Sequence, residues 1–387
     1  MAAPRGRAEP AWPRGASVRV SPFVERYPES LDHETLLVRR GARSGLYTIV
    51  AVHSTTRGPA TGGCRMWTYD DSRAAIRDAL RLSRAMTFKN AVAGLPFGGG
   101  KGVVMVRPDR PLDDQRRRAA LVDFGDTVEI LGGRYVTAED VGTSDADMEV
   151  IAERTAHVAG LSVERGGSGD PSPYTALGCL VAIERTCERV FGAPSLSDRQ
   201  VAVIGLGRVG GRLARRLAEA GASLILSDVD ESRRALADEL GATWASPAEA
   251  LEADVDVLSP CALGGILDDE TVPRLRAPIV AGAANNQLAG EAIADLLQRR
   301  GILWAPDFVV NAGGIINIAV ELEPEGYSHE RAVARVRGIG DTLDEIFDRA
   351  EAGGTTPLTA AMELARRRLA ESRAEPATTD GPRRGAS

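Results

Sequence analysis

The sequence predicts an α/β protein of two domains, on the basis of its length and of two different patterns along the chain. It has 387 residues, 43% of them hydrophobic and 26% charged, which is ordinary for a globular protein and long enough for about two domains. After residue 170, short apolar runs alternate with amphipathic helical stretches, a pattern typical of a parallel sheet with helices on both faces. Before residue 170 the pattern has a different character, so we expect a separate domain there.

In the first part of the chain we expect strands at 44–54 and 102–106 and helices at 71–87 and 113–131. The first of these helices begins at Asp71 or Ser72, both of which are good N-cap residues. Its apolar residues recur at helical spacing and would turn one face towards a core. They are Ile76, Ala79, Leu80 and Met86.

In the second part, a helix at 174–191 precedes five apolar runs, VAVIG, SLILSD, VDVLSP, PIVAGA and ILWAPD, with a helical stretch between each pair. Two more helices follow, at 328–352 and 357–371. Both ends of the chain are too poor in apolar residues to order themselves. The expected organisation is a disordered arm (1–17), a first domain (18–169), a second domain (170–329), C-terminal helices that return to the first domain (330–371) and a disordered tail (372–387).

Composition excludes several classes of protein. A net charge of −7 without a dense basic stripe argues against nucleic acid as the main partner, and no apolar run approaches the length of a membrane helix. The N-terminus lacks the apolar segment of a secretory signal, so we expect a cytoplasmic protein. The four cysteines and four histidines have neither metal-ligand nor disulfide-framework spacing, and we expect reduced cysteines and no metal site.

The clearest motif is G-x-G-x-x-G, formed by Gly205, Gly207 and Gly210 between an apolar strand and a helix. In a Rossmann unit the first glycine permits the tight turn, the second lets the backbone approach a pyrophosphate, and the third lets the helix pack on the strand. The helix N-terminus would face the phosphates with free N–H groups. The loop therefore predicts a dinucleotide site that also includes Leu206, Arg208 and Val209.

The next strand ends at Asp228, 23 residues after Gly205, where a carboxylate can accept hydrogen bonds from ribose hydroxyls. A carboxylate there would also repel a 2'-phosphate, so we expect NAD in preference to NADP. Arg233 and Arg234 lie nearby, but arginines on a helix surface are usually solvated.

Lysine use is a second unusual feature, because only two of the 47 basic residues are lysines: Lys89 and Lys101. Arginine cannot be deprotonated in a protein, whereas burial can shift the pKa of a lysine by several units. Composition alone leaves chance and function about equally plausible as explanations. The sequence around the two lysines has to decide.

Lys101 ends the glycine-rich run GLPFGGGKG (94–102). The run is not a phosphate-binding P-loop, because Leu95 stands where the first glycine should be and Gly102 where Ser or Thr should be. We expect a flexible loop that folds over Lys101 and excludes water, lowering the pKa of the lysine towards neutrality so that it can act as a general base. Lys89, a second cation, would lower that pKa further and anchor a carboxylate.

Six segments taken together resemble, in order and spacing, the leucine, valine and phenylalanine dehydrogenase branch of the amino-acid dehydrogenases. They are GPATGGCRMWTYDD, ALRLSRAMTFKNAVAGLPFGGGKG, GGRYVTAEDVGTSDADM, CALGGILDDETVPRL, AGAANNQL and APDFVVNAGGIINIAVEL, and the resemblance covers about residues 25 to 370. It implies a mixed-sheet domain for catalysis and assembly, a Rossmann domain, a deep cleft between them, and a homo-oligomer built from dimers.

Carried over by motif, the resemblance implies that Lys101 is the catalytic base, that Asp140 is a second acid/base group and that Lys89 binds the substrate carboxylate. Asn286 would lie where cofactor and amino group meet, although the adjacent Asn285 leaves that assignment open. The remaining implied residues line the amino-acid site (Gly62, Gly63), the side-chain pocket (Ile315, Ile318) and the NAD site (Thr175, Ala262).

The implied reaction is hydride transfer from Cα of an L-amino acid to NAD, followed by loss of ammonia to give the 2-keto acid, and its reverse. Ile315 and Ile318 favour a branched aliphatic side chain. Thr61 and Phe97 stand where leucine is more usual, and the smaller Thr61 keeps phenylalanine or another aromatic substrate as an alternative. A catalytically silent NAD-binding sensor is a remote alternative, because it would be expected to lack Lys101 or Asp140.

Overall fold

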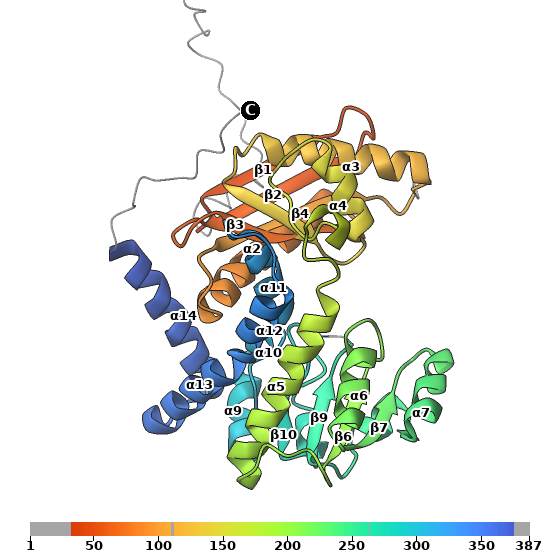
Figure 1. Ribbon diagram of the computed structural model, residues 1–387, viewed down its shortest axis with the longest axis vertical. Helices are drawn as coiled ribbons and strands as arrows, with labels where there is room; N and C mark the ends of the chain where they lie inside the picture. Colours follow the sequence, from red (N-terminus) through yellow and green to blue (C-terminus); the bar gives the residue numbers. More distant parts are fainter. Residues whose placement is uncertain (1–31, 110–111, 263, 375–387) are drawn as a thin grey trace, which may run out of the picture.

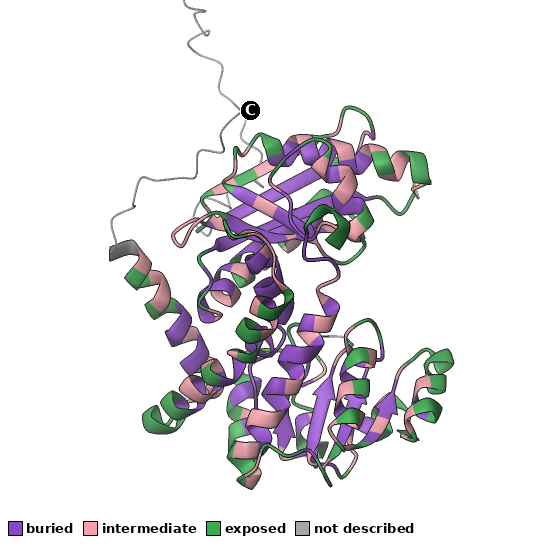
Figure 2. Cartoon of the chain, in the orientation of Figure 1, coloured by how far each residue is buried: buried purple, intermediate pink, exposed green. Residues whose placement is uncertain are grey.

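The computed structural model describes residues 32–109, 112–262 and 264–374, and these residues form two β-sheets with helices around and between them. Figure 1 shows the sheets at opposite ends of the molecule, with α5 (Ser172–Phe191) and the C-terminal helices between them. In Figure 2 the strands of both sheets are mostly buried, whereas the outer helices are exposed along one side. Among the described residues, no helix is long and apolar enough to span a membrane.

The first sheet is mixed, as expected, and has the strand order β1-β2-β4-β3-β5. β2 lies antiparallel to β1 and to β4, whereas β3 lies parallel to β4 and to β5. The strands are β1 (Thr35–Arg40), β2 (Tyr47–Ser54), β3 (Ala60–Thr68), β4 (Gly98–Val106) and β5 (Tyr135–Glu139). The sequence analysis predicted β2 and the second half of β4 and missed the other three strands.

Helices cover both faces of this sheet. α2 (Ser72–Val92) begins at its N-cap Asp71, as expected, and packs its apolar face on β2 and β4. α3 (Asp114–Glu129) and α4 (Asp145–Ala152) share a second core with the opposite faces of β2 and β4. Alternate residues of β2 therefore enter different cores: Ile49 faces α2, and Val50 faces α3.

The run GGGK does not form the expected flexible loop: it is the buried first half of β4. The glycines permit close approach of neighbouring segments instead of motion. A Cβ atom on Gly98 would lie 1.8 Å from the Ser54 carbonyl oxygen, and one on Gly99 would lie 2.2 Å from the backbone nitrogen of Thr87 in α2. Lys101 is therefore held on a rigid strand, and α2 packs directly against that strand.

The second sheet is entirely parallel, with the order β11-β10-β9-β6-β7-β8 of a Rossmann fold. Its strand order reverses between β6 and β9, which places a crevice at the carboxyl ends of these strands. The strands are β6 (Gln200–Ile204), β7 (Ser223–Ser227), β8 (Thr243–Trp244), β9 (Val257–Pro260), β10 (Ile279–Val280) and β11 (Leu303–Trp304). Its helices are α6 (Gly210–Glu219), α7 (Arg234–Leu240), α8 (Pro247–Leu251) and α9 (Ala292–Arg299), and short 3-10 turns occur at Val163–Arg165, Glu231–Arg233 and Val272–Arg274.

The remaining helices join the two sheets. They are α10 (Asp307–Val310), α11 (Gly313–Glu321), α12 (His329–Arg337), α13 (Ile339–Gly353) and α14 (Pro357–Ala374). The helix predicted at 328–352 is therefore two helices, separated at Gly338. α14 packs on α2, where the Arg368 guanidinium donates to the Val92 carbonyl. Residues 372–374, predicted to be disordered, belong to α14. The predicted disordered arm (1–17) and the rest of the predicted tail (375–387) lie outside the described residues.

Candidate active site

A cavity of about 530 Å³ lies between the two sheets, at the carboxyl ends of the strands of the second. It is the deep cleft that the sequence analysis expected. One wall comes from the first sheet and α2, and the other from the loop after β6, the start of α5, and α11. Of the expected site residues, the cavity brings together Gly63, Lys89, Lys101, Asp140, Thr175, Gly207, Arg208, Val209, Ile315 and Ile318.

Lys101 and Asp140 form an ion pair in this cavity, with the lysine Nζ 2.8 Å from the Asp140 Oδ2. The Arg65 Nε donates to the same oxygen at 2.8 Å, and Arg65 also pairs with Asp78. Burial by itself raises the pKa of Asp140, but the charges of Lys101 and Arg65 outweigh it and lower the pKa to about 2. Asp140 is therefore ionised at neutral pH.

Lys89 lies in the last turn of α2 and donates a hydrogen bond of 2.6 Å to the Asn311 Oδ1. Asn311 in turn donates to the Asn285 Oδ1 at 2.9 Å and to the Ala283 carbonyl at 3.1 Å. Burial, with a further contribution from the charge of Lys101, lowers the pKa of Lys89 to about 8 although Asp307 opposes the shift. The ammonium of Lys89 is thus positioned by residues of the opposite wall.

The glycine loop has the geometry expected for a dinucleotide site. Gly205 has a φ of +98°, and a Cβ atom on it would lie 2.5 Å from the Cβ of Ala262, so Ala262 packs directly against the turn. A Cβ on Gly210 would lie 1.9 Å from the Gly205 carbonyl oxygen, whereas one on Gly207 would meet nothing within 4 Å. The loop is therefore compact at both ends and open in the middle, as approach of a pyrophosphate requires.

Asp228 lies where the sequence analysis placed it, at the end of β7, and its Oδ2 accepts a hydrogen bond of 2.6 Å from the Leu206 backbone N–H. This contact holds the glycine loop, the Oδ1 accepts from the Asp230 backbone N–H at 2.9 Å, and each oxygen keeps a second lone pair for a ribose hydroxyl. Together, the open centre of the loop and this carboxylate fit the adenosine half of NAD.

Several expected residues support the cavity without lining it. Gly62 packs so closely that a Cβ on it would lie 1.8 Å from the Gly100 carbonyl oxygen, and its own carbonyl accepts a hydrogen bond from the Tyr135 hydroxyl. The Leu206 side chain is buried in the core. The remaining residues of this group are Gly205, Gly210, Asp228, Ala262 and Asn286.

Of the two adjacent asparagines between which the sequence left the assignment open, Asn285 lies on the cavity wall, and Asn286 follows it outside the lining. Asn286 has a φ of +53°, a left-handed conformation that asparagine tolerates better than most residues. This turn directs the Asn285 side chain to Asn311 and the cavity. The motif contains both asparagines, and only the backbone conformation distinguishes them.

The expected side-chain pocket lies on one face of α11. Ile315 and Ile318 are one turn apart, buried, and line the cavity together with Met86 of α2. Thr61, which was expected to enlarge this pocket, is buried, accepts a hydrogen bond from the Asn90 side chain and is not part of the lining. The wall of the pocket is therefore formed by the aliphatic side chains of Ile315 and Ile318 and by the flexible side chain of Met86.

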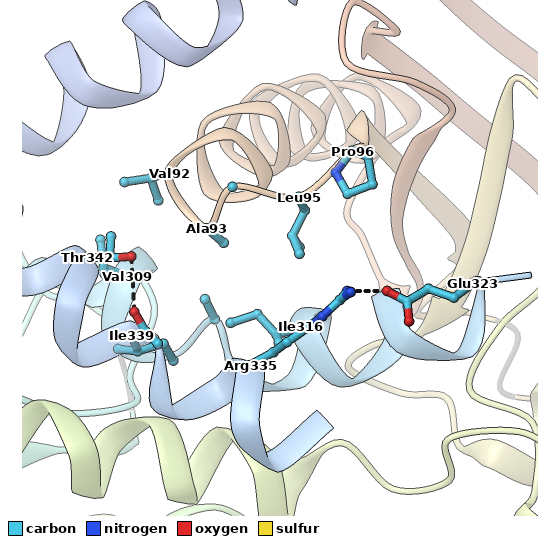
Figure 3. A pocket seen from close by; sticks show the side chains of 13 residues that line it. Val92, Ala93, Leu95, Pro96, Val309, Ile316, Glu323, Arg335, Ile339 and Thr342 are labelled. Atoms are coloured by element: carbon cyan, nitrogen blue, oxygen red, sulfur yellow. Dashed lines mark hydrogen bonds and ion pairs between the residues drawn. The ribbon is translucent and has the colours of Figure 1, made fainter. Parts of the chain in front are cut away.

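A second cavity, of about 470 Å³, lies on the other side of α11, and we call it the α11 rear cavity. Figure 3 shows Leu95 and Ile316 projecting into it and the ion pair between Arg335 and Glu323 at one end. Its walls come from the end of α2 and from α10 to α13. Residues of both parts of the molecule thus enclose it.

Comparison with known proteins identifies the family. Residues 35–157 match the model of the Glu/Leu/Phe/Val dehydrogenase dimerisation domain, and residues 225–376 match the model of the glutamate/leucine/phenylalanine/valine dehydrogenases. The leucine dehydrogenase of Geobacillus stearothermophilus is 43% identical over 89% of this chain and 92% of its own. The chain belongs to the glutamate, leucine, phenylalanine and valine dehydrogenase family. The resemblance inferred from the six segments is confirmed.

Two further relatives show the range of this dehydrogenase family. The valine dehydrogenase of Streptomyces virginiae is 43% identical over 88% of this chain and 95% of its own. The crystal structure of the L-tryptophan dehydrogenase of Nostoc punctiforme superimposes with a TM-score of 0.76 and 39% identity, covering 91% of this chain and all of that one. Residues 184–264 also match the NAD-binding domain of the D-isomer-specific 2-hydroxyacid dehydrogenases, and the expected cofactor, NAD, is confirmed.

Several residues in or beside the dehydrogenase's cavity were not predicted from the sequence. Arg65 and Asn311 stand inside segments already singled out, GGCRMW and VVNAGG, but only the fold shows that they contact Asp140 and Lys89. Glu139 precedes Asp140 and lines the same cavity. Burial raises its pKa to about 7, although the charge of Arg208 opposes that shift. A carboxylate with a raised pKa in a cleft is a candidate for a functional role.

Proposed function

We propose that this dehydrogenase catalyses the NAD-dependent oxidative deamination of a branched-chain L-amino acid, such as leucine, valine or isoleucine, to the 2-keto acid and ammonia, together with the reverse reductive amination. One observation carries the proposal: the Lys101 and Asp140 ion pair, the Lys89 ammonium, the aliphatic wall of Ile315 and Ile318 and the glycine loop meet in one cavity. These groups are what an amino acid and a dinucleotide need at a common site.

In the mechanism that we propose, Lys89 binds the substrate carboxylate, and Asn311 fixes the position of the Lys89 ammonium. The substrate side chain then lies against Ile315 and Ile318, which orients Cα in the cavity. Thr175, at the start of α5, lies on the wall next to the glycine loop and is positioned to contact the nicotinamide carboxamide. When bound, NAD supplies the hydride acceptor.

Lys101 acts as the general base that assists attack of water on the imine of the substrate. Asp140 is an ionised carboxylate, so its first role is to hold the Lys101 Nζ at 2.8 Å in the correct orientation. It can also accept and return a proton as ammonia leaves the tetrahedral carbon. Arg65 donates to Asp140 and is itself held by Asp78. These contacts keep the Lys101 and Asp140 ion pair in a fixed position.

The substrate class is tested by measuring NADH formation with purified enzyme and a panel of L-amino acids. We expect leucine, valine and isoleucine to be oxidised with higher kcat/KM than phenylalanine or tryptophan. A preference for the aromatic substrates would favour the alternative, which the flexible Met86 in the lining and the similarity to an L-tryptophan dehydrogenase support. No turnover with any member of the panel would favour an NAD-binding sensor.

We also propose that the enzyme is a homo-oligomer built from dimers. β1 is an edge strand that pairs only with β2 among the described strands. Leu36 and Val38, on one face of β1, are 36% and 41% exposed, an apolar surface that an isolated edge strand would usually avoid. A cytoplasmic location belongs to the same proposal and is consistent with four free cysteines.

A further inference from the structure

Glu139, the last residue of β5, is a buried carboxylate that the proposed mechanism does not use. Its side chain is 8% exposed and lines the active-site cavity. The Oε1 lies 3.6 Å from an Arg208 nitrogen, beyond hydrogen-bond distance, and the Oε2 has no hydrogen-bond partner among the described residues. A buried carboxylate is costly unless donors reach it, and the contacts that favour the ionised form of Glu139 are the charge of Arg208 and the backbone N–H of Asp145. The Oε2 can therefore take a further donor.

The position of Glu139 in the cavity indicates which donor it lacks. It follows Ala138 along the wall and directly precedes Asp140, which pairs with Lys101 at the reacting end. Its ion-pair partner, Arg208, belongs to the glycine loop, where the pyrophosphate binds. Glu139 therefore lies between the pyrophosphate end and the reacting end of the cavity. In NAD, the group between the pyrophosphate and the nicotinamide is a ribose with two hydroxyls.

We propose that Glu139 is a cofactor-binding residue whose carboxylate accepts hydrogen bonds from the hydroxyls of the nicotinamide ribose, while Arg208 turns from Glu139 towards the pyrophosphate. The proposal rests on NAD binding in this cavity. It assigns to the nicotinamide half of the cofactor a carboxylate equivalent to the one that Asp228 provides for the adenosine half.

Charges around Glu139 agree with this assignment. Arg208 is also paired with Asp170 at 2.9 Å, a closer contact than that with Glu139, so Glu139 is the weaker of its two partners. Burial and the negative charges of Asp170 and Asp145 disfavour the ionised form of Glu139, whereas the charge of Arg208 and the Asp145 backbone N–H favour it. Two hydroxyl donors would offset this cost and favour the carboxylate.

Asp170 provides a matched control. Both Asp170 and Glu139 contact the Arg208 guanidinium, but only Glu139 lines the cavity. Replacing either carboxylate removes one of the two acidic contacts of Arg208. Only the loss of Glu139 should remove an acceptor for the ribose.

The experiment compares the binding of two fragments of the cofactor, ADP and ADP-ribose, and of NADH to the intact enzyme by titration calorimetry. ADP-ribose contains the second ribose and ADP does not, so the ratio of their dissociation constants isolates the ribose contribution. We expect Glu139→Ala to raise Kd(ADP-ribose)/Kd(ADP) by about tenfold, the effect of a hydrogen bond to a charged acceptor. Glu139→Gln should raise it less, and Asp170→Asn should leave it unchanged.

A ratio that is unchanged in Glu139→Ala, or that shifts equally in Asp170→Asn, would overturn the proposal. A merely structural role for Glu139 predicts a lower melting temperature for Glu139→Ala, whereas a role in binding the ribose predicts a melting temperature close to that of the wild-type enzyme, because the contact with Arg208 at 3.6 Å is long. If the wild-type enzyme binds NADH but the ratio does not move, only this inference fails. If the wild-type enzyme does not bind NADH, the proposed function fails with it.

Discussion

Lys101 and Lys89 differ in the partner that the fold gives each of them. Lys101 faces the ionised Asp140, whereas Lys89 faces the neutral amide of Asn311. A lysine opposite a neutral amide keeps its charge free for an incoming carboxylate, and one paired with a carboxylate is held in place for proton transfer. An arginine has a larger planar head group that does not lose its proton, so it is suited to neither position.

Lys101→Ala should lower kcat by about 10²- to 10⁴-fold, the usual contribution of a general base. NADH binding should remain close to that of the wild-type enzyme, because the glycine loop lies on the other wall of the cavity. Stopped-flow or steady-state NADH formation and a fluorescence titration with NADH measure the two effects. Lys101→Arg, which keeps the positive charge but cannot act as a base, should be as impaired as the alanine variant. Turnover near the wild-type rate in either variant would remove Lys101 from the mechanism.

The pKa of Lys89, lowered to about 8 by burial, gives a second prediction at this scale. Below about pH 8 the ammonium is present and binds the substrate carboxylate, and above it the charge is lost, by a factor of ten for each pH unit. KM for a 2-keto acid should therefore rise with pH above about 8, whereas kcat should change less. The 2-keto acid is the better probe because it has no amino group that titrates in this range.

Initial rates of reductive amination at saturating ammonia, measured at a series of pH values, check this prediction. Lys89→Arg is the control, because its guanidinium stays charged and its KM, although higher, should not follow the same pH dependence. A wild-type KM that is constant across the alkaline range would contradict a carboxylate-binding role for Lys89.

Single residues were predictable where chemistry restricts the residue type. Lysine chemistry and the glycine spacing pointed to Lys101, Lys89 and the loop at 205–210, all of which the fold brings to one cavity or its support. Arg65, Asn311 and Glu139 were not predictable, because arginine, asparagine and glutamate are common residues. Their roles depend on long-range contacts: Arg65 contacts a residue 75 positions away, Asn311 one 222 positions away, and Glu139 contacts Arg208 across the cleft.

At the scale of elements, the turn between β6 and α6 gives a contrast between two glycines of one motif. Gly207→Ala should fold normally, since the added methyl group meets no protein atom within 4 Å, but it should weaken NADH binding because the pyrophosphate must approach there. Gly210→Ala should instead destabilise the second domain, since its Cβ would lie 1.9 Å from the Gly205 carbonyl oxygen. Thermal melts and NADH titrations of both variants separate the two effects. The hypothesis fails if Gly207→Ala melts earlier than Gly210→Ala.

Element prediction succeeded where hydrophobic periodicity is strong and failed where it is short or masked by glycine. α2 and the central strands β6 and β7 have clear patterns. β8 has two residues, too few for any period, and it was missed. The first half of β4 consists of glycines, which suggest a loop in isolation. Close packing explains them: α2 and β2 crowd Gly98 and Gly99, and the Tyr135 and Phe124 rings crowd Gly100 and Gly102.

For the whole molecule, the edge of the first sheet predicts the assembly. Leu36→Asp combined with Val38→Asp should dissociate the oligomer, because two charges would replace the apolar face of β1. Light scattering after size-exclusion chromatography measures the mass. Val229→Asp, at a position 89% exposed in the second domain, is the control and should leave the mass unchanged. A wild-type enzyme that is monomeric, or a double variant with the wild-type mass, would refute assembly through β1.

The two-domain architecture and the cleft were predictable because a parallel-sheet pattern and a glycine motif imply a crevice at the strand ends. The contacts that join the two parts were not. The hydrogen bond from Lys89 to Asn311 connects α2 of the first part to the chain between α10 and α11, 222 residues later. The position of the Lys89 ammonium therefore depends on both walls of the cavity.

α11 lies between two cavities, the active-site cavity and the α11 rear cavity. Ile315 and Ile318 line the proposed substrate cavity on one side of this helix, and Ile316 borders the open pocket of about 470 Å³ on the other (Figure 3). Closely packed side chains resist displacement, whereas side chains next to open space can move more easily. We therefore expect larger side chains at Leu95 or Ile316 to change which amino acids the enzyme accepts, although neither residue lines the proposed substrate cavity.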